Sequence, residues 1–247
     1  MANSQVTFIQ SIYDERSENY DNSHHGALAD AYIRTAEPLP GESVLDLACG
    51  TGLVSLLAEE KVGRSGYVVG IDISPDILPS GSEGFDLITC AAALVLLPDP
   101  DQAIRHWTTW LKPGGRLVTD VAAKDVHVPS RILRRISDKL GVSLQWDESW
   151  VQDEQSLGNL LGSAGLDVKT VFLTESFQER VYKLADAEEA FEKAVSSPMF
   201  GNFGNPAIRD EAKRLFVEKF AEEAGPSGVL IDEAKMYMAV ARRPPCK

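Results

Sequence analysis

Short, continuously apolar segments alternate with amphipathic segments along the first half of the chain. The apolar segments "SVLDL", "YVVGIDIS", "FDLITC" and "GRLVTDVA" are typical of strands that are buried on both faces of a parallel sheet. Between them, residues 53–63 and 99–111 have helical spacing and are closed by glycines. This order predicts an α/β protein with a Rossmann-like, doubly wound and mostly parallel sheet that carries helices on both faces.

The second half predicts further helices and two closing strands. Amphipathic helical spacing, also present at residues 1–40, recurs at residues 129–141, 153–165, 186–197 and 206–225. Residues 167–177 and 231–241 predict an antiparallel pair of strands at the far edge of the sheet. Because no repeat or long polar linker divides the chain, we expect one domain over residues 1–247. Its parts would be a helical cap at 1–40, a core at 41–124, and lid helices and final strands at 125–247.

Composition and charge narrow the class of protein. Acidic residues outnumber basic ones by 37 to 24, which gives a formal net charge of −13. Because nucleic-acid phosphates require basic surfaces, we expect no nucleic-acid partner. No apolar run approaches the ~20 residues that span a bilayer, and the first residues lack a signal-peptide pattern. Cys49, Cys90 and Cys246 show no disulfide or metal-ligand spacing. We therefore expect a cytoplasmic protein without a membrane span or a metal.

A glycine turn follows the first predicted strand, in "LDLACGTG". It places Asp46, Gly50 and Gly52 at the carboxyl end of the strand, where open α/β sheets bind ligands. The glycines allow close approach of a ligand, and the helix that follows offers free N–H groups. Asp72, at the end of the second strand, is placed to accept the hydroxyls of a ribose. Alternatively, both aspartates are turn residues and the glycines are tight bends.

The turn lacks the third glycine of a nicotinamide-binding fingerprint and the "GK[ST]" of a P-loop. Instead, "VLDLACGTGLVSLLA", "GIDIS" and "FDLITCAAALVLLPDPDQAIRHWTTWLKPGGRL" together resemble the class I S-adenosylmethionine-dependent methyltransferases. The likeness is greatest to the small-molecule branch that includes the ubiquinone and menaquinone methyltransferases, and it runs from about Ser43 to Val121. It implies an enzyme that uses S-adenosylmethionine, with residues 41–124 as the cofactor-binding core and the later helices as a lid.

The resemblance also implies roles for individual residues. The backbone of Ala48, Gly50 and Gly52 would hold the methionyl part of the cofactor. Asp46 would anchor this loop or bind the methionyl amine. Cys90 would approach the methionyl amine and the sulfonium.

Ala91, the next residue, lies at the tip of the "FDLITCAA" strand and would approach the same amine and sulfonium. On the other side of the cofactor, Asp72 would bind the ribose hydroxyls and Ile73 would pack against the adenine. Tyr20, like Tyr13, belongs to the N-terminal segment that would close over the cofactor. Alternatively they belong to a core, which is the more frequent place for aromatic residues at this spacing.

Methyl transfer requires little of the side chains, because the sulfonium is already activated and the protein mainly aligns the reacting atoms. An oxygen or acidic carbon nucleophile would also need a base. His24 and His25 are the candidates, since they lie in the N-terminal segment that could face the pocket. Neighbouring histidines cannot both point into one site, and both could be surface residues. His106 and His127 are weaker candidates.

Only ten residues, 75–84, separate the second predicted strand from "FDLITC". Members of the resembled family carry a helix, a third strand and an acidic turn at this place. The third, edge strand is therefore expected to be missing, with about thirty residues absent between Leu78 and Pro79. A link of this length reaches at most ~33–36 Å, which is enough to begin the next strand but leaves no room for a covering helix.

Three interpretations of this missing segment stay open: a working methyltransferase whose pocket the lid or a second subunit completes, a splice form or mispredicted gene product with weak or no cofactor binding, and a methyltransferase-fold protein that no longer methylates. We expect S-adenosylmethionine-dependent methyl transfer to a small, apolar or aromatic molecule, with an exposed second strand that favours association as a homodimer. The alternative is a truncated or degenerate methyltransferase-fold protein without methylation activity, which acts as a binding or regulatory partner.

The lid is expected at about residues 125–155 and 186–225, with "SSPMFGNFGNP" as its gate. Large apolar side chains in it would either line an acceptor pocket or form a core: Trp146, Trp150, Phe191, Met199, Phe200 and Phe203.

Overall fold

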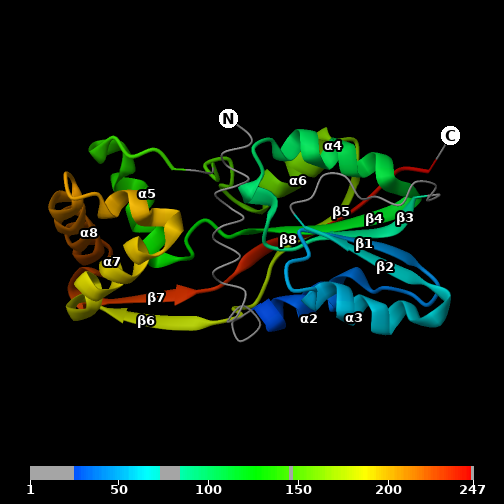
Figure 1. Cartoon of the computed structure of the whole chain (residues 1–247), viewed down its shortest axis with the longest axis horizontal. Coiled ribbons are helices and arrows are strands. Elements are labelled where there is room, and N and C mark those ends of the chain that lie inside the picture. The colour runs from blue at the N-terminus through cyan, green and yellow to red at the C-terminus, as the bar shows by residue number, and fades with distance from the viewer. Residues whose placement is uncertain (1–24, 73–83, 145–146, 246–247) are drawn as a thin grey trace. The chain divides into compact units, whose positions relative to one another are not determined.

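The structure is a computed structural model of the 247-residue chain, and it describes residues 25–72, 84–144 and 147–245. The chain divides into two compact units (Figure 1). Of the described residues, the sheet unit comprises 25–72, 84–124, 147–175 and 236–245, and the helical unit comprises 125–144 and 176–235. The first boundary coincides with the predicted start of the lid, and the expectation of a single domain stays a prediction.

The sheet unit contains six strands in the order β2-β1-β3-β4-β8-β5. Their bounds are β1 Ser43–Leu47, β2 Tyr67–Ile71, β3 Phe85–Cys90, β4 Leu111–Ala122, β5 Asp167–Leu173 and β8 Met236–Arg242. The first four strands pair in parallel, and β8 pairs antiparallel with both β4 and β5. This topology confirms the predicted doubly wound, mostly parallel sheet with antiparallel strands at its far edge.

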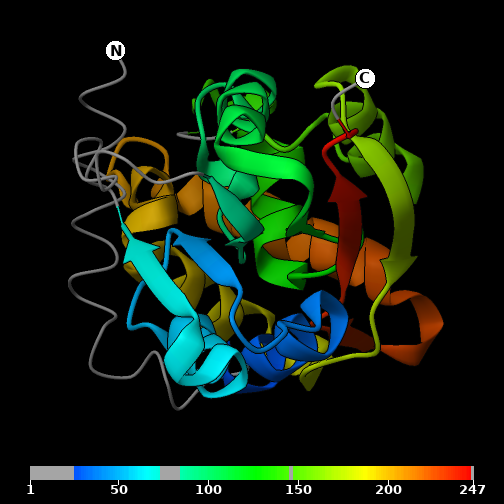
Figure 2. The same ribbon diagram turned by 90° about the vertical axis from the view of Figure 1, so that its right-hand side faces the viewer.

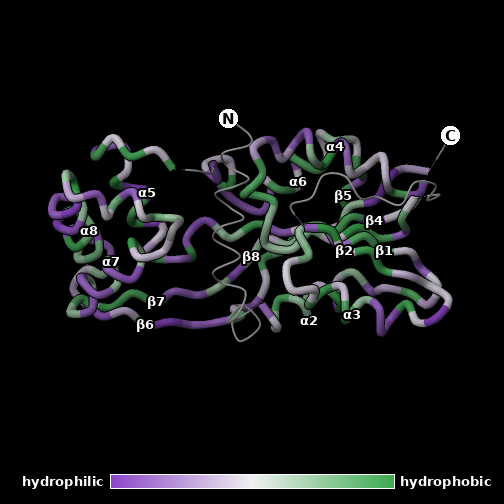
Figure 3. The backbone as a smooth tube through the Cα atoms, in the orientation of Figure 1, coloured by the Kyte–Doolittle hydropathy of each residue, from purple (hydrophilic) through white to green (hydrophobic). Residues whose placement is uncertain are grey.

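Helices cover both faces of this sheet, as predicted. In Figure 1, α2 and α3 lie on one side of the strands, and α4 and α6 lie on the other. Their bounds are α2 His25–Ala36, α3 Leu53–Val62, α4 Pro100–Trp110 and α6 Glu154–Ser163. Figure 3 shows that hydrophobic positions concentrate along the central strands, which explains why the core lies between the two helical layers. No helix in the described part of the chain is long and apolar enough to cross a membrane.

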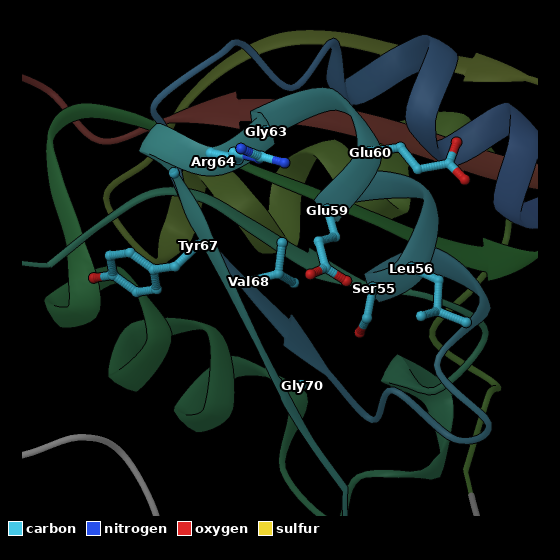
Figure 4. A pocket seen from close by; sticks show the side chains of 10 residues that line it. Ser55, Leu56, Glu59, Glu60, Gly63, Arg64, Tyr67, Val68 and Gly70 are labelled. Atoms are coloured by element: carbon cyan, nitrogen blue, oxygen red, sulfur yellow. The ribbon is translucent and has the colours of Figure 1, made fainter.

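Strand β2 forms one edge of the sheet, as the sequence predicted (Figure 2, cyan arrow). Among the described residues it pairs only with β1, and none of its five residues is fully buried. A hollow of about 530 Å³ lies between β2 and α3, where Glu59 of the helix points toward Val68 of the strand (Figure 4). The predicted join between Leu78 and Pro79 lies outside the described residues.

The helical unit contains α5 Val128–Leu140, α7 Ala187–Ser196 and α8 Arg209–Ala224, which pack on one another. These three helices confirm the sequence prediction. Part of the predicted gate forms a short 3-10 helix, Pro198–Gly204. The interior of the unit is aromatic: the rings of Phe191 and Phe216 lie 5.6 Å apart, and both side chains are buried.

The prediction of a single closing strand over residues 231–241 is wrong. This stretch divides between β7 Val229–Glu233 in the helical unit and β8 in the sheet unit. Strand β7 pairs antiparallel with β6 Glu179–Lys183. The division follows from a turn in which the Lys235 N–H donates to the Glu233 carbonyl at 2.9 Å. Asp232, Glu233 and Lys235 interrupt the apolar residues at this turn, so the charged cluster was the available signal.

Candidate functional site

The loop between β1 and α3 has an unusual backbone. Ala48, Gly50 and Gly52 have positive φ angles of 54°, 52° and 88°. For the alanine such a conformation costs on the order of 1–3 kcal/mol, so the surrounding structure must hold it. A Cβ at either glycine would meet no atom within 4 Å, which means that both glycines border open space. The loop therefore forms an accessible backbone cradle at the carboxyl end of β1.

The Asp46 carboxylate holds this loop in place through two hydrogen bonds. Its Oδ1 accepts a hydrogen bond from the Thr89 hydroxyl at 2.7 Å, and its Oδ2 accepts one from the Ser55 hydroxyl at 2.6 Å. Burial raises the pKa of this carboxyl, while the two hydroxyls oppose the rise. The residue thus links β1, β3 and the first turn of α3. Because both oxygens already have partners, the geometry favours an anchoring role over direct binding of an amine.

Asp72 brings the end of β2 against the same loop. Its Oδ2 accepts the Gly50 N–H at 2.7 Å, and the Cys49 N–H donates to the Ile71 carbonyl at 3.1 Å. Gly70 allows this close packing, since a Cβ there would lie 3.0 Å from the Cys49 Sγ. The carboxylate is exposed, and no described hydrogen bond uses its Oδ1. One oxygen thus fixes the loop, and no described hydrogen bond occupies the other.

A small cavity of about 30 Å³ lies beside the loop. Residues from four places line it: His25, Leu28 and Ala29 from α2, the loop with Asp46, Ala48, Cys49 and Thr51, Leu53 and Val54 at the start of α3, and the turn Ala91–Ala92 after β3. The structure therefore brings together four of the predicted site residues, namely His25, Asp46, Ala48 and Ala91. Gly50 and Gly52 belong to the same loop.

Cys90 contributes to the site only through its backbone. Its side chain is fully buried in the core of the sheet unit, and burial raises the pKa of its thiol well above the usual range. Its carbonyl oxygen accepts a hydrogen bond from the Thr119 hydroxyl at 3.0 Å. A reactive or ligand-binding thiol at this position is therefore excluded by its surroundings.

Other predicted residues fall elsewhere. Tyr13, Tyr20, His24, Ile73 and Trp146 lie outside the described residues. The His106 ring lies 4.4 Å from the Trp110 ring on α4, and the His127 N–H donates to Asp232 in the helical unit. Among the described residues, no group of three or more potential ligands could hold a metal.

For most of the large lid side chains, the structure shows whether they lie in a core. Phe191, Phe200 and Phe203 are buried in the helical unit, so they form its core. Trp150 belongs to the sheet unit, where it packs against the core. Met199 is only partly buried.

Sequence reasoning missed a buried polar pair next to the cavity. Asp120 on β4 and Tyr32 on α2 are both fully buried. The Asp120 Oδ1 accepts the Ala92 N–H at 2.8 Å and also the Tyr32 hydroxyl. Burial raises the pKa of Asp120 to about 6 and raises that of Tyr32 well above its usual value. The available signal was the aspartate inside the apolar run "LVTDVA". The apolar neighbours predict a strand that is buried on both faces, and an acid is rarely buried without a partner.

Comparison with known proteins agrees with this arrangement. Residues 20–171 match the family described as the methyltransferase domain. The chain belongs to this methyltransferase family. It is 36% identical over 123 residues to the ubiquinone/menaquinone biosynthesis C-methyltransferase of Xanthomonas axonopodis pv. citri, covering 46% of this chain and 47% of that protein. It is 27% identical over 137 residues to the aklanonic acid methyltransferase of Streptomyces sp. (strain C5), covering 44% and 62% of the two chains.

The chain thus spans about half the length of the curated relatives that it matches. A solved structure with the same fold is the cyclopropane-fatty-acyl-phospholipid synthase-like protein from Lactobacillus casei. Its TM-score is 0.54 at 15% identity, with 94% of this methyltransferase and 92% of that chain covered. The family match confirms the resemblance seen in the sequence, and the structural match confirms the fold.

Proposed function

We propose that the chain transfers a methyl group from S-adenosylmethionine to a small, apolar or aromatic molecule. The observation that carries this proposal is the hydrogen bond from the Gly50 N–H to Asp72. It joins an acid at the end of β2 to the backbone cradle at the end of β1, so that one continuous surface offers both. A ribose and a methionyl group attached to the same sulfur would need these two features side by side.

The residues present fit such a cofactor. The open sides of Gly50 and Gly52 leave room for the methionyl group over the loop. The Asp72 Oδ1, which no described hydrogen bond uses, would accept the ribose hydroxyls. Asp46 would act from beneath by keeping the loop in place. When bound, the cofactor would supply an activated methyl group, and the protein would align the acceptor with it.

The cavity beside the loop is much smaller than the cofactor, at about 30 Å³. Its walls on one side come from α2, through His25, Leu28 and Ala29. We therefore propose that α2 roofs the methionyl end of the site, and that the start of this helix moves outward when the cofactor binds.

His25 is the proposed base. It lines the cavity together with Ala91 and Ala92, and the family resemblance implies that Ala91 approaches the sulfonium of the cofactor. A neutral imidazole there could accept the proton that an oxygen or acidic carbon nucleophile releases. His25→Ala would then slow turnover by about 10²–10⁴-fold at saturating cofactor, whereas cofactor affinity would change little.

The acceptor is proposed from the relatives. Their names refer to ubiquinone/menaquinone biosynthesis and to aklanonic acid. Compounds of the quinone and polyketide types are therefore the first acceptors to test with this chain, in a screen that follows the formation of S-adenosylhomocysteine.

The first test is calorimetric titration of the full chain with S-adenosylmethionine and S-adenosylhomocysteine. We expect dissociation constants in the micromolar range, about −8 kcal/mol. Asp72→Ala should weaken binding about 10- to 100-fold, because two hydroxyls lose a charged acceptor. Asp101→Ala removes an exposed acid that pairs with Arg105 on α4, and this control should bind normally. A folded wild-type chain that binds neither ligand would refute the proposal.

A further inference from the structure

The turn that follows β3 is strained and lies on the cofactor side of the sheet. Ala92 has a φ of 53°, a conformation that a residue with a Cβ adopts only under constraint. Ala91 and Ala92 both line the cavity. Something in the surrounding structure must therefore hold this turn in shape.

Asp120 supplies that constraint. Its Oδ1 accepts the Ala92 N–H at 2.8 Å, which fixes the strained peptide to the middle of β4. The other oxygen, Oδ2, is buried and has no hydrogen-bond partner. A buried carboxylate with one unpartnered oxygen costs folding free energy, and an apolar side chain would fill this place more cheaply. Packing alone therefore does not explain an acid here.

Tyr32 connects the same carboxylate to α2. Its hydroxyl donates to the Asp120 Oδ1 and lies 2.7 Å from the Cys90 carbonyl oxygen, at the start of the strained turn. Tyr32 follows His25 by seven residues, which is about two helical turns, so both side chains lie on one face of α2. The contact thus fixes the helix that carries the proposed base.

The charged and titratable groups around Asp120 are few. Among the described residues, α2 contributes Tyr32, β3 contributes the Cys90 thiol, and β1 contributes Asp46. No described cation pairs with the Asp120 carboxylate. Hydrogen bonding to the turn and to α2 is therefore what this acid does in the structure.

We propose that Asp120 and Tyr32 are positioning residues of the methyl-transfer site. Together they hold the Ala91–Ala92 turn and the roof helix α2 in the geometry that receives the methionyl end of the cofactor. This inference rests on the proposed function, because it concerns the same cavity.

The test measures the affinity of the full chain for S-adenosylhomocysteine by calorimetry. Asp120→Ala removes the acceptor and should weaken binding roughly tenfold, since the turn loses the bond that offsets its strain. Asp120→Asn keeps an acceptor oxygen and should bind within about twofold of wild type. Tyr32→Phe releases α2 from Asp120 and from the Cys90 carbonyl but leaves the Ala92 bond in place, and it should weaken binding about threefold.

A rescue variant separates positioning from general destabilisation. Glycine adopts a positive φ without strain, so adding Ala92→Gly to Asp120→Ala should restore most of the lost affinity. Arg116→Met is the matched control. Arg116 is also buried on β4, but it holds the opposite end of α2 through the Ala36 and Glu37 carbonyls. This control should lower the melting temperature and leave the affinity within about twofold.

Two results would overturn the inference. In the first, Asp120→Ala and Tyr32→Phe lower the melting temperature as Arg116→Met does but bind S-adenosylhomocysteine like wild type. In the second, Ala92→Gly restores nothing. If wild type itself does not bind, the proposed function fails, and hydrogen exchange at the Ala92 amide still decides the positioning. That amide should lose its protection in Asp120→Ala and keep it in Asp120→Asn.

Discussion

Strands β1 and β2 are neighbours in one sheet, yet their surroundings are opposite. All five residues of β1 are buried, and the carboxylate of its Asp46 has a partner for each oxygen. None of the five residues of β2 is fully buried, and Tyr67 is 46% exposed. The contrast follows the chain itself, because β1 has a strand on each side, whereas the described chain adds nothing beyond β2.

The difference teaches that the site does not require a covered edge. Strand β2 contributes to it only at its carboxyl end, where Gly70 admits the loop and Asp72 binds the Gly50 N–H. These contacts are local and point toward β1. The outer side of β2 can therefore be exposed while the cradle is intact. The comparison can be tested separately at the centre of the sheet, which is β1 and its neighbours, and at the edge, which is β2.

The largest effect is expected at the centre, for Asp46→Ala. This change leaves two hydroxyls, of Ser55 and Thr89, without their acceptor inside the protein. It should lower the free energy of unfolding by about 2–5 kcal/mol in denaturant titrations and abolish measurable binding of S-adenosylhomocysteine. Asp101→Ala, at an exposed side chain of α4, is the control for both readouts. Unchanged stability of Asp46→Ala would show that the centre is not what holds the loop.

The pH dependence of stability should reveal the second buried acid of the centre. The pKa of Asp120 rises from an ordinary 3.8 to about 6 on folding, mainly through burial. The folded state thus favours the protonated form. The stabilisation is fully present below about pH 4 and is lost as the pH rises through about 6, in total roughly 3 kcal/mol. Asp120→Asn should remove this dependence, so that the free energy of unfolding of the variant rises relative to that of wild type by about that amount between pH 4 and 7.

The measurement is the difference in unfolding free energy between Asp120→Asn and wild type at each pH, because other groups cancel in the difference. A flat difference from pH 4 to 7 would mean that Asp120 ionises normally in the folded chain.

Equal substitutions should cost less at the edge than at the centre. Val44→Ala removes two methyl groups from a fully buried position of β1, which should cost about 2 kcal/mol. Val68→Ala removes the same atoms from a half-buried position of β2 and should cost less than about 1 kcal/mol. Urea titration of both variants decides this. Equal losses would show that the outer side of β2 is covered in solution.

The sequence predicted the centre well because its signals there are local. A buried apolar run, a glycine turn and an acid about 20 residues later are sufficient to place β1, the loop and Asp72. The edge position of β2 followed from the short link after it. The family then extended this pattern to Ala91, which does line the cavity.

The remaining features depend on contacts between distant parts of the chain. Tyr32 and Asp120 are 88 residues apart, and nothing in either segment indicates their bond. The pairing of β6 with β7 was missed for the same reason, because an alternating strand of five residues with exposed charges resembles a loop. Phe191 and Phe203 could be assigned to a core or to a pocket only once their packing was known.

The smallest effect concerns association at the edge, for which we propose a homodimer through β2 and α3. The hollow beside β2 exposes Leu56 and Tyr67, by 59% and 46%, and its rim carries both Glu59 and Arg64. Two copies related by a twofold axis could set the acid of one against the base of the other. The net charge of −13 opposes this contact. The dimer should therefore be weak, with a dissociation constant on the order of 10–100 μM.

Added salt should strengthen such a dimer, because screening weakens the repulsion between two acidic chains more than it weakens contact between apolar surfaces. Sedimentation equilibrium at low and high salt measures this directly. Leu56→Glu should prevent association, whereas Leu39→Glu, an equally exposed leucine that does not line the hollow, should not. Because Leu56 does not line the cavity beside the loop, Leu56→Glu should also bind S-adenosylhomocysteine like wild type. A variant that lost both properties together would show that the site depends on its edge after all.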